Sequence, residues 1–177
     1  MAHVEKTMFR EYDIRGRVND DELNATSGKL IGQAYGTFLH KRQVDTAVVG
    51  YDCRVGSEDI KEGVIEGLLS TGCNIIDLGM ITTPMMYWAQ YHFNVMGGAM
   101  ITGSHNPKGW NGLKLAHGLS YTLIGKELEE LLASIEKEAF VKGRGKRNSA
   151  SILEDFAEDL AGRVSIKKPF CIVVDAG

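Results

Sequence analysis

The chain has 177 residues, of which 44% are hydrophobic and 24% are charged, as is usual for a soluble globular protein. This composition excludes a disordered tail, and 21 glycines without a repeat period exclude collagen. The formal net charge of -3 argues against a dedicated binder of nucleic acid or of anionic membranes. A chain of this length can form one good-sized domain, or one domain and part of another.

Cysteine usage and the N-terminal residues favour the reducing cytoplasm. Cys53, Cys73 and Cys171 are odd in number, widely spaced and without a C-x-x-C pair, so a disulfide framework is not expected. Residues 1–10 lack the apolar core of a signal peptide. No apolar run approaches the roughly 20 residues that span a bilayer. We therefore expect a cytoplasmic protein that has no nucleic-acid or membrane partner.

Short apolar runs alternate with helical patterns along the chain. The predicted strands cover 46–52, 74–79, 97–102 and 170–175. The predicted helices cover 30–39, 60–69, 85–93, 125–140 and 151–165. Ser57 is a plausible start for the second helix and Gly72 its end, while Pro84 suits the first turn of the third. Continuous apolar strands between helices predict a layered α/β domain whose sheet is covered on both faces.

A basic, glycine-containing stretch over 141–149 marks a boundary. We interpret it as an exposed loop or hinge rather than as a contact for phosphates or nucleic acid, because a short charge run is usually solvated. The strand over 170–175 has no crossover element after it to continue a parallel sheet, which is typical of a fragment. We therefore expect one domain over 1–150, followed by a linker helix and the opening strand of a second domain over 151–177.

The densest group of polar residues is the loop 102–114, TGSHNPKGWNGLK, which follows the third predicted strand. Open α/β sheets bind ligands in loops beyond the carboxyl ends of their strands. The loop offers the hydroxyl of Ser104, the imidazole of His105, the amide of Asn106 and the ammonium of Lys114. Such a serine can act as a nucleophile or carry a phosphoryl group, although turns without any function have a similar composition.

Two smaller clusters are weaker candidates. The segment 9–17, FREYDIRGR, contains Tyr12 and three arginines, whose planar guanidinium groups suit phosphate or carboxylate. By itself it reads better as an edge strand with ordinary surface charges. Asp52 and Arg54 follow the first predicted strand, and we interpret them as a salt-bridged loop end.

Several standard signatures are missing from the sequence. It contains no G-x-G-x-x-G after a strand, no G-x-x-x-x-G-K-[ST], no G-x-S-x-G and no H-E-x-x-H. Dinucleotide binding, a P-loop, an α/β-hydrolase elbow and a zincin site are therefore all disfavoured.

Four motifs resemble, in the expected order, those of the α-D-phosphohexomutases, the family of phosphomannomutases and phosphoglucomutases. They are FREYDIRG at 9–16, VVGYDCRVGS at 48–57, IIDLGMITTPM at 75–85 and ITGSHNPKGWNGLK at 101–114. The last resembles the active-site serine loop, with Gly103 where many members have alanine. The resemblance covers nearly the whole chain and implies a three-layer α/β/α first domain with a mixed, mostly parallel sheet.

The resemblance also implies roles for individual residues. Ser104 would bear the transferable phosphoryl group, and His105 beside it would give or take a proton. Lys114 and Arg15 would contact the phosphoryl group or the reacting oxygen of the sugar. This agrees with the chemistry, since a phosphoserine carries about -1.5 to -2 charges and its transfer requires cations around the equatorial oxygens.

For the substrate, the resemblance implies a hexose phosphate, with Tyr12 facing the sugar and Asn106 helping to hold the loop. The family are isomerases, and the reaction has two steps. Phosphoserine donates to the hexose phosphate, the hexose 1,6-bisphosphate intermediate reorients, and the other phosphate returns to Ser104. The bisphosphate also serves as activator.

The resemblance implies a Mg²⁺ cofactor that this chain could hold only in part. The family ligates the ion through an aspartate-rich loop of the second domain and one oxygen of the phosphoserine. Mg²⁺ demands near-octahedral oxygen ligation, so Ser104 alone could not hold it firmly. Since the chain resembles only the first of four domains and the opening strand of the second, we expect it to fold but to be essentially inactive without domains two to four.

Two other functions stay open. A stand-alone module could use the same loop to bind a phosphorylated ligand without chemistry, in which case Ser104→Ala would only weaken affinity. A serine hydrolase built on Ser104 and His105 is a weaker alternative, because the imidazole of an adjacent residue rarely reaches its neighbour's hydroxyl.

Overall fold

The computed structural model describes residues 4–175, in which strands and helices alternate except that β5 follows β4 directly. The strands are β1 (Ile14–Arg17), β2 (Thr46–Tyr51), β3 (Asn74–Met80), β4 (Gly97–Ile101), β5 (Trp110–His117) and β6 (Arg147–Ser149). The helices are α1 (Ala25–His40), α2 (Ser57–Ser70), α3 (Thr83–Phe93), α4 (Lys126–Glu136) and α5 (Leu153–Gly162), with a short 3-10 turn, η1, at Lys6–Met8.

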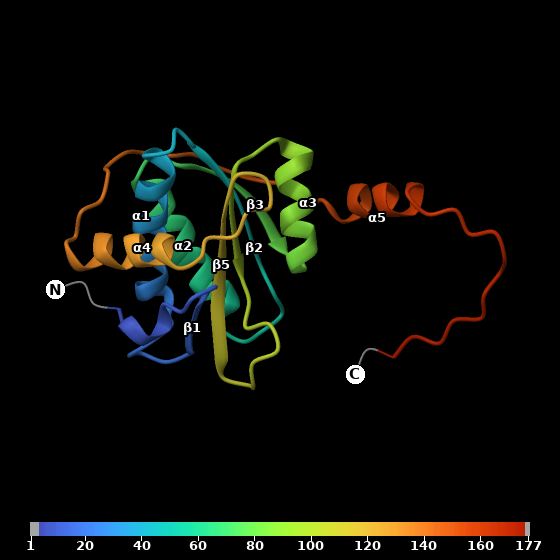
Figure 1. The fold of residues 1–177 in the computed structure, drawn as a ribbon, viewed down its shortest axis with the longest axis horizontal. Helices are drawn as coiled ribbons and strands as arrows, with labels where there is room; N and C mark the ends of the chain where they lie inside the picture. The colour runs from blue at the N-terminus through green and yellow to red at the C-terminus, as the bar shows by residue number, and fades with distance from the viewer. Residues whose placement is uncertain (1–3, 176–177) are drawn as a thin grey trace.

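The strands form one mixed sheet in the order β1-β5-β4-β2-β3-β6. Strands β4, β2, β3 and β6 run parallel, whereas β5 is antiparallel to both β4 and β1. Helices α1, α2 and α4 lie on one side of this sheet and α3 lies on the other (Figure 1). The expected three-layer α/β/α domain with a mostly parallel sheet is therefore confirmed.

Alternate residues of each strand divide the core into two parts. Val49 of β2 packs in the larger cluster with residues of α1, α2 and α4, whereas the neighbouring Val48 packs in a smaller cluster with residues of α3. Ile101 and Met100 of β4 divide in the same way. Successive strand side chains point to opposite faces, so apolar runs of this kind bury both faces of the sheet.

Local signals explain where the helices begin. The side chain of Asn24 caps α1 by accepting hydrogen bonds from the amides of Thr26 and Ser27. Proline occupies the first turn of α3, as predicted for Pro84. Helix α2 begins one residue earlier than a cap at Ser57 would place it, because Gly56 is the N-cap and Ser57 is already helical and buried. The hydroxyl of Ser57 is thereby free to turn toward β2, where the candidate site lies.

Helix α5 lies beyond α3, as Figure 1 shows, and contacts it mainly through Trp88. The ring nitrogen of Trp88 donates to Asp159 at 2.7 Å, and its ring meets the edge of Phe156. None of the residues of α5 is buried. The helix predicted over 151–165 is therefore confirmed, but it contributes little to the core.

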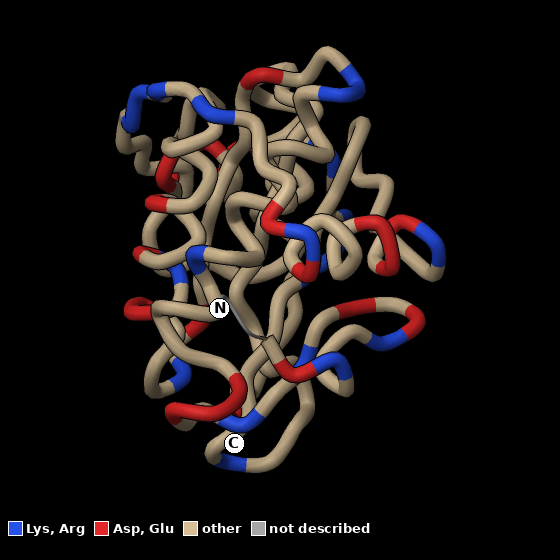
Figure 2. Tube along the Cα trace, turned by 90° about the vertical axis from the view of Figure 1, so that its left-hand side faces the viewer, with Lys and Arg blue, Asp and Glu red and all other residues tan. Residues whose placement is uncertain are grey.

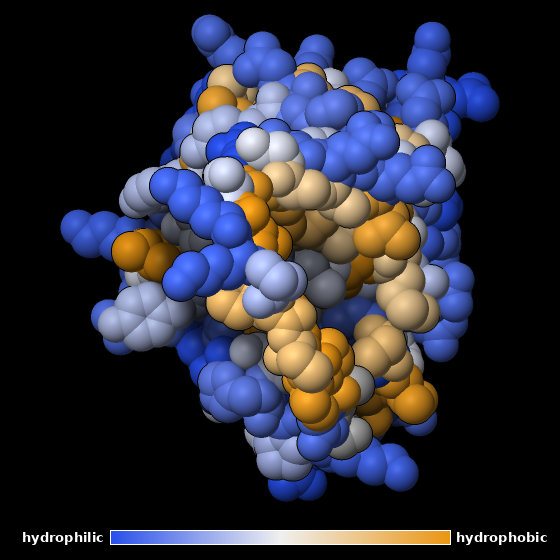
Figure 3. Space-filling model, turned by 90° about the vertical axis from the view of Figure 1, so that its right-hand side faces the viewer, coloured by the Kyte–Doolittle hydropathy of each residue, from blue (hydrophilic) through white to orange (hydrophobic). Residues whose placement is uncertain are grey.

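Three segments differ from the sequence prediction. Strands β5 and β6 lie where loops were expected, and the strand expected over 170–175 is not formed. A strand is stable only where a neighbour pairs with it, and β5 and β6 find partners in β4 and β3. The apolar side chains of 170–174 are exposed, with Val173 at 91%. On the face of the molecule where this C-terminal segment lies, apolar residues surround a hollow (Figure 3).

Charge is spread over the surface rather than gathered on one face. Acidic and basic residues are interspersed on the side shown in Figure 2. Among residues 4–175, no helix is both long enough and apolar enough to cross a membrane. Cys53, Cys73 and Cys171 are all free thiols.

Candidate active site

Two cations of the predicted site meet at a buried carboxylate. Arg15 on β1 lies opposite Gly112 of β5, so Lys114, two residues further along β5, projects from the same face of the sheet. Between them lies Asp13, which is only 7% exposed. Its Oδ2 lies 2.7 Å from both Nε and Nη2 of Arg15 and 3.8 Å from Nζ of Lys114. The carboxylate therefore keeps the two cations side by side.

Arg15 also joins the edge strand to the serine loop. Its Nη1 donates to the side-chain oxygen of Asn106 at 2.7 Å, across 91 residues of sequence. A guanidinium has five donors in a fixed plane, so it can bind a carboxylate with one edge and an amide oxygen with another. Asn106 thereby fixes the distance between the cationic pair and the loop that carries Ser104.

Ser104 is exposed and lies in a left-handed backbone conformation with φ of 51°. Residues other than glycine adopt this conformation rarely, and it is found at functional sites when the surroundings hold it. Its amide donates to the hydroxyl oxygen of Thr102 at 2.9 Å. Its own hydroxyl lies 3.2 Å from Nδ1 of His105. The structure thus presents a hydroxyl and an imidazole together to solvent.

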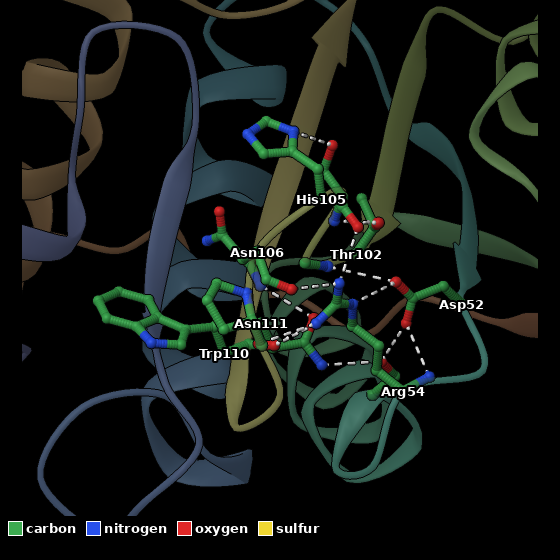
Figure 4. A network of polar contacts seen from close by, with 12 residues as sticks. Asp52, Arg54, Thr102, His105, Asn106, Trp110 and Asn111 are labelled. Carbon is green, nitrogen blue, oxygen red and sulfur yellow. Dashed lines mark hydrogen bonds and ion pairs between the residues drawn. The ribbon is translucent and has the colours of Figure 1, made fainter. Parts of the chain in front are cut away.

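Beneath the loop, Arg54 binds a series of backbone carbonyl groups (Figure 4). Its Nη2 donates to the carbonyl oxygens of Ser104 and Asn106 at 2.8 and 2.7 Å. Its Nη1 donates to those of Pro107 and Trp110 at 3.2 and 3.3 Å. The loop therefore folds around a single guanidinium, which β2 places there from the adjacent strand end.

Asp52 completes this network from the end of β2. One carboxylate oxygen accepts from the amide of Gly103 at 3.2 Å and lies 3.6 Å from Nε of Arg54. The other accepts from the amide of Arg54 and from the hydroxyl of Ser57 at 2.6 Å. Asn111, fully buried in β5, donates to that same hydroxyl at 2.8 Å. Asp52, Arg54, Ser57 and Asn111 are thus linked behind the loop by hydrogen bonds and an ion pair.

An open groove of about 630 Å³ begins beside this network. Asp52, Cys53 and Thr102 line one end of it, at the carboxyl ends of β2 and β4. Its other walls come from the segment between β3 and α3 and from the start of α5, and they are largely apolar. Its position agrees with the general rule that open α/β sheets bind ligands beyond the carboxyl ends of their strands.

The structure brings together most of the residues singled out from the sequence. Ser104 and His105 are in contact, Asn106 binds Arg15, and Lys114 reaches Arg15 through Asp13. Tyr12 stands apart, since its side chain is 61% exposed. It adjoins Asp13 in the chain, so it borders the cationic pair rather than belonging to the hydrogen-bonded network.

The part that Asp13 and Arg54 play in the site was not assigned from the sequence. Asp13 lies within the quoted motif FREYDIRG, and its position two residues before Arg15 was a usable signal, because such residues share a face of a strand. Arg54 was expected to form a salt-bridged loop end with Asp52, which it does. Its contacts with the serine loop could not be foreseen, because they join residues about 50 positions apart.

The contact between Ser104 and His105 corrects one expectation. The imidazole of an adjacent residue was expected to miss the hydroxyl, yet the two atoms are 3.2 Å apart, because the left-handed turn at Ser104 brings the side chains together. A hydrolytic triad also needs a carboxylate to orient the imidazole. The carboxylates of this site, Asp13 and Asp52, are engaged by Arg15 and Arg54 instead.

The residues present do not fit a complete magnesium site. Within residues 4–175, no three or more His, Cys, Asp or Glu side chains are grouped so that they could hold a metal ion. Mg²⁺ requires six oxygen ligands at short distance. From this loop, only the phosphoryl oxygens of a phosphorylated Ser104 would serve as ligands.

A model of one protein family matches most of the chain. Residues 6–142 match the model described as phosphoglucomutase/phosphomannomutase, alpha/beta/alpha domain I. The matched segment contains Tyr12 and the whole polar network of the site, from Asp13 to Lys114, and it ends before β6 and before the wall of the groove at the start of α5.

Individual relatives and a solved structure agree with this match. A phosphoglucomutase of Neisseria gonorrhoeae is 35% identical over 179 residues, which cover 100% of this chain and 38% of the relative. A phosphomannomutase/phosphoglucomutase of Pseudomonas aeruginosa is 34% identical over 171 residues, which cover 97% of this chain and 36% of the relative. The crystal structure of a phosphoglucomutase/phosphomannomutase family protein from Burkholderia thailandensis superposes with a TM-score of 0.89 at 26% identity, over 94% of this chain and 38% of that one. The chain thus spans less than two fifths of the length of these relatives.

Proposed function

Because the chain belongs to the phosphoglucomutase/phosphomannomutase family and matches its first domain, we propose that Ser104 is the carrier of the phosphoryl group in a hexose-phosphate mutase. The observation that carries this proposal is the position of Ser104. Its hydroxyl is exposed, its backbone is held in a rare conformation, and Asn106 links its loop to the cationic pair of Arg15 and Lys114.

The chemistry proceeds by two transfers in opposite directions. In the first, the bond between phosphorus and Oγ of Ser104 breaks, and a bond forms to a free hydroxyl oxygen at C1 or C6 of the hexose phosphate. The sugar hydroxyl loses its proton to a base, and Oγ regains one. The bisphosphate then turns round, and its other phosphoryl group returns to Ser104, which leaves the isomeric monophosphate.

His105 is suited to the proton transfer. Its Nδ1 lies 3.2 Å from Oγ of Ser104, which is within reach for a proton that moves as the phosphoryl group leaves or returns. An imidazole nitrogen can either give or take a proton, so His105 can act in both directions of the transfer.

Arg15 and Lys114 supply the positive charge that the transfer needs. A transferring phosphoryl group spreads its negative charge over three equatorial oxygens, and fixed cations stabilise that charge. Asp13 holds both cations in place before the substrate arrives, so little reorganisation is needed during the reaction. Tyr12, exposed beside them, would contact the sugar.

Mg²⁺ would supply further neutralisation of the phosphoryl oxygens when bound. From this chain, the phosphorylated Ser104 would provide its ligand oxygens, and the other ligands would have to come from elsewhere in a complete enzyme. The free thiols at Cys53, Cys73 and Cys171 support a reducing, cytoplasmic setting for this enzyme.

The chain by itself should accept a phosphoryl group but should not turn over a substrate. The relatives are more than twice as long, so contacts that hold and reorient the sugar would lie outside the matched part. A coupled assay with glucose 1-phosphate should therefore give no sustained formation of glucose 6-phosphate. Sustained turnover by the purified 177-residue chain would contradict this statement.

Replacement of Ser104 tests the assignment of the carrier. After incubation with glucose 1,6-bisphosphate, intact-mass spectrometry should show one added phosphoryl group on the wild type and on the control Ser149→Ala, which changes an exposed serine in β6. The variant Ser104→Ala should show none. Retained phosphorylation in Ser104→Ala would contradict the proposal, and unchanged wild-type mass together with tight binding of the bisphosphate would favour a binding module.

A further inference from the structure

We propose that Arg54 is a positioning residue for Ser104. Its guanidinium draws the carbonyl oxygens of the serine loop to the inner side, holds the unusual backbone of Ser104, and removes acceptor oxygens from the surroundings of the phosphoryl group. The inference rests on the proposed function of Ser104 as phosphoryl carrier, but it concerns the shape and the charge of the loop and can be tested separately.

The first argument is the number of contacts that one side chain makes. Arg54 donates to four carbonyl oxygens within residues 104–110, at distances from 2.7 to 3.3 Å. Each terminal nitrogen donates two of these four hydrogen bonds, while Nε faces Asp52. Only a guanidinium has enough donors in one plane for this arrangement, and the three donors of a lysine ammonium diverge from a single point.

The second argument is the backbone of Ser104. A left-handed conformation at a serine persists only where its surroundings hold it. Here the amide of Ser104 donates to Thr102 at 2.9 Å, and its carbonyl oxygen accepts from Arg54 at 2.8 Å. The residue is therefore held on both sides, and its side chain has one direction in which to present the hydroxyl.

The third argument is electrostatic. A phosphoserine carries about -1.5 to -2 charges at neutral pH, and carbonyl oxygens are the negative ends of peptide dipoles. With four of these oxygens engaged by Arg54, the loop offers a bound phosphoryl group less repulsion. Asp52 does not cancel this effect at the phosphoryl group, because its oxygens accept from Gly103, from Ser57 and from the amide of Arg54 behind the loop.

The fourth argument is the space at residue 103. A Cβ added to Gly103 would lie 2.7 and 2.8 Å from Nε and Cδ of Arg54, and 2.8 Å from the carbonyl oxygen of Trp110. These distances are too short for non-bonded atoms, so in this chain a side chain at residue 103 would require the guanidinium or the loop to shift. Gly103→Ala should therefore displace Arg54 without changing any charge.

A phosphoserine encoded at position 104 allows the test without any phosphoryl transfer. The pKa of its phosphate can be followed by ³¹P NMR in the wild type, in Arg54→Gln, in Arg54→Lys and in Gly103→Ala. The matched control is Arg42→Gln, since Arg42 also binds a backbone carbonyl, that of Phe38, and a carboxylate, that of Glu130, on the far end of α1. Thermal unfolding of each variant shows that it is folded.

The expected result is a higher pKa of the phosphate in each variant in which Arg54 no longer holds the carbonyl oxygens of the loop. Arg54→Gln and Gly103→Ala should raise it by about 0.5 or more, because the negative phosphate then faces freed carbonyl oxygens. Arg54→Lys should give an intermediate value, and Arg42→Gln should leave the titration unchanged. The amide resonances of Gly103, Ser104 and Asn106 should shift in the same variants.

Coincident titration curves for the wild type and a folded Arg54→Gln would overturn the inference. If Arg54→Gln does not fold, a curve of Arg54→Lys or of Gly103→Ala that coincides with the wild type would overturn it equally. Because the phosphate is encoded, these results do not depend on whether the chain can accept a phosphoryl group. Failure of the proposed function would appear instead as no phosphorylation of the wild type by glucose 1,6-bisphosphate.

Discussion

Asp13 shows how one residue can set the charge of a whole site. It is buried beside the edge strand and faces both Arg15 and Lys114, so each cation is partly neutralised before any phosphate is present. Two cations at short distance repel each other, and the carboxylate between them offsets this repulsion. If Ser104 carries a phosphoryl group as proposed, that group would meet two cations already in position.

Asp13→Asn should uncouple these two cations. The amide keeps the size of the side chain but removes its charge, and breaking a buried ion pair in this way leaves an uncompensated cation. We expect the free energy of unfolding to fall by about 2–4 kcal/mol, toward the range typical of buried pairs. Urea denaturation measures this fall.

A control for Asp13→Asn is Asp155→Asn, which changes a more exposed carboxylate on α5 with a side chain exposed by 58%. An exposed ion pair contributes about 0–1 kcal/mol, so this variant should unfold almost as the wild type does. Equal stability of Asp13→Asn and the control would show that Asp13 does not hold the cations.

At the scale of elements, the close approach of α1 and α2 depends on small residues. Gly28 of α1 faces the carbonyl oxygen of Ile60, and an added Cβ would lie only 2.8 Å from it. Gly63 of α2 faces the carbonyl oxygen of Ala25 in the same way. Without side chains at these positions the two backbones come together, and the apolar residues of both helices pack against the sheet.

Gly63→Ala should therefore destabilise the fold. The added methyl group would collide with the backbone of α1, and overpacking of this kind costs about 1–3 kcal/mol. The matched change Gly162→Ala, at the end of α5 with open space around it, should alter stability by less than about 0.5 kcal/mol. Differential scanning calorimetry of both variants makes the comparison, and a wild-type Tm for Gly63→Ala would contradict the packing argument.

The basic stretch after α4 is tied to the sheet by charge. Arg147 of β6 forms two hydrogen bonds with Glu62 of α2, at 2.7 and 2.8 Å, and also contacts Asp77 of β3. Lys61 faces the same two carboxylates. The hydrogen bonds from Arg147 are the main reason why the pKa of Glu62 is lowered from its usual 4.5 to about 2.

This lowered pKa predicts a specific dependence on pH. A carboxyl group whose pKa is lower in the folded state stabilises the fold above its unfolded value and loses that contribution as pH falls through the folded value. The wild type should thus lose stability between about pH 4.5 and pH 2. Glu62→Gln should lose less over the same interval, and Glu154→Gln, at the exposed start of α5, should follow the wild type.

Urea midpoints measured through this interval would reveal the difference in slope. Parallel curves for the wild type and Glu62→Gln would contradict the role given to the pair of Glu62 and Arg147. The pKa of Asp77 is lowered as well, although its burial acts in the opposite direction, so some loss of stability should remain in Glu62→Gln.

The apolar strands and the helices could be predicted from the sequence, because each carries its own periodicity. Strand β5 could not, since it begins with Trp110 and Asn111 next to a turn and includes Lys114 at its centre. Its hydrogen bonds come from β4 and β1, which no local pattern reveals. The segment 170–175 shows the reverse, because its β-branched residues suggest a strand, but no described strand pairs with it.

The site, too, has a part that local sequence reveals and a part that depends on the fold. Ser104, His105, Asn106 and Lys114 lie within one loop and strand, so their grouping could be read from the sequence. The role of Arg54 depends on how β2 and β4 lie side by side in the sheet, and this is a property of the fold. Resemblance to a family singled out Ser104 as the candidate, but only the structure shows how its loop is held.

For the molecule as a whole, the site lies at the edge of the matched domain rather than within an enclosed cleft. Ser104, His105 and Tyr12 are exposed, and the cations beside them lie on a sheet face near the edge strand β1. Catalysis of phosphoryl transfer requires exclusion of water from the reacting groups, so that the sugar hydroxyl is the acceptor. The proposed carrier Ser104 would therefore depend on the substrate, or on parts of a complete enzyme outside the matched domain, to exclude water.

The measurement that tests the central claim most directly is a ³¹P NMR experiment on the wild-type chain. We predict that glucose 1,6-bisphosphate produces one phosphoserine resonance, and that an excess of glucose 6-phosphate then discharges it at its C1 hydroxyl, with formation of the bisphosphate and without formation of glucose 1-phosphate. That result, together with no such resonance in Ser104→Ala, would establish Ser104 as a reversible phosphoryl carrier. Absence of the resonance, or its loss only to inorganic phosphate, would contradict the account and would describe a binding module or a hydrolase instead.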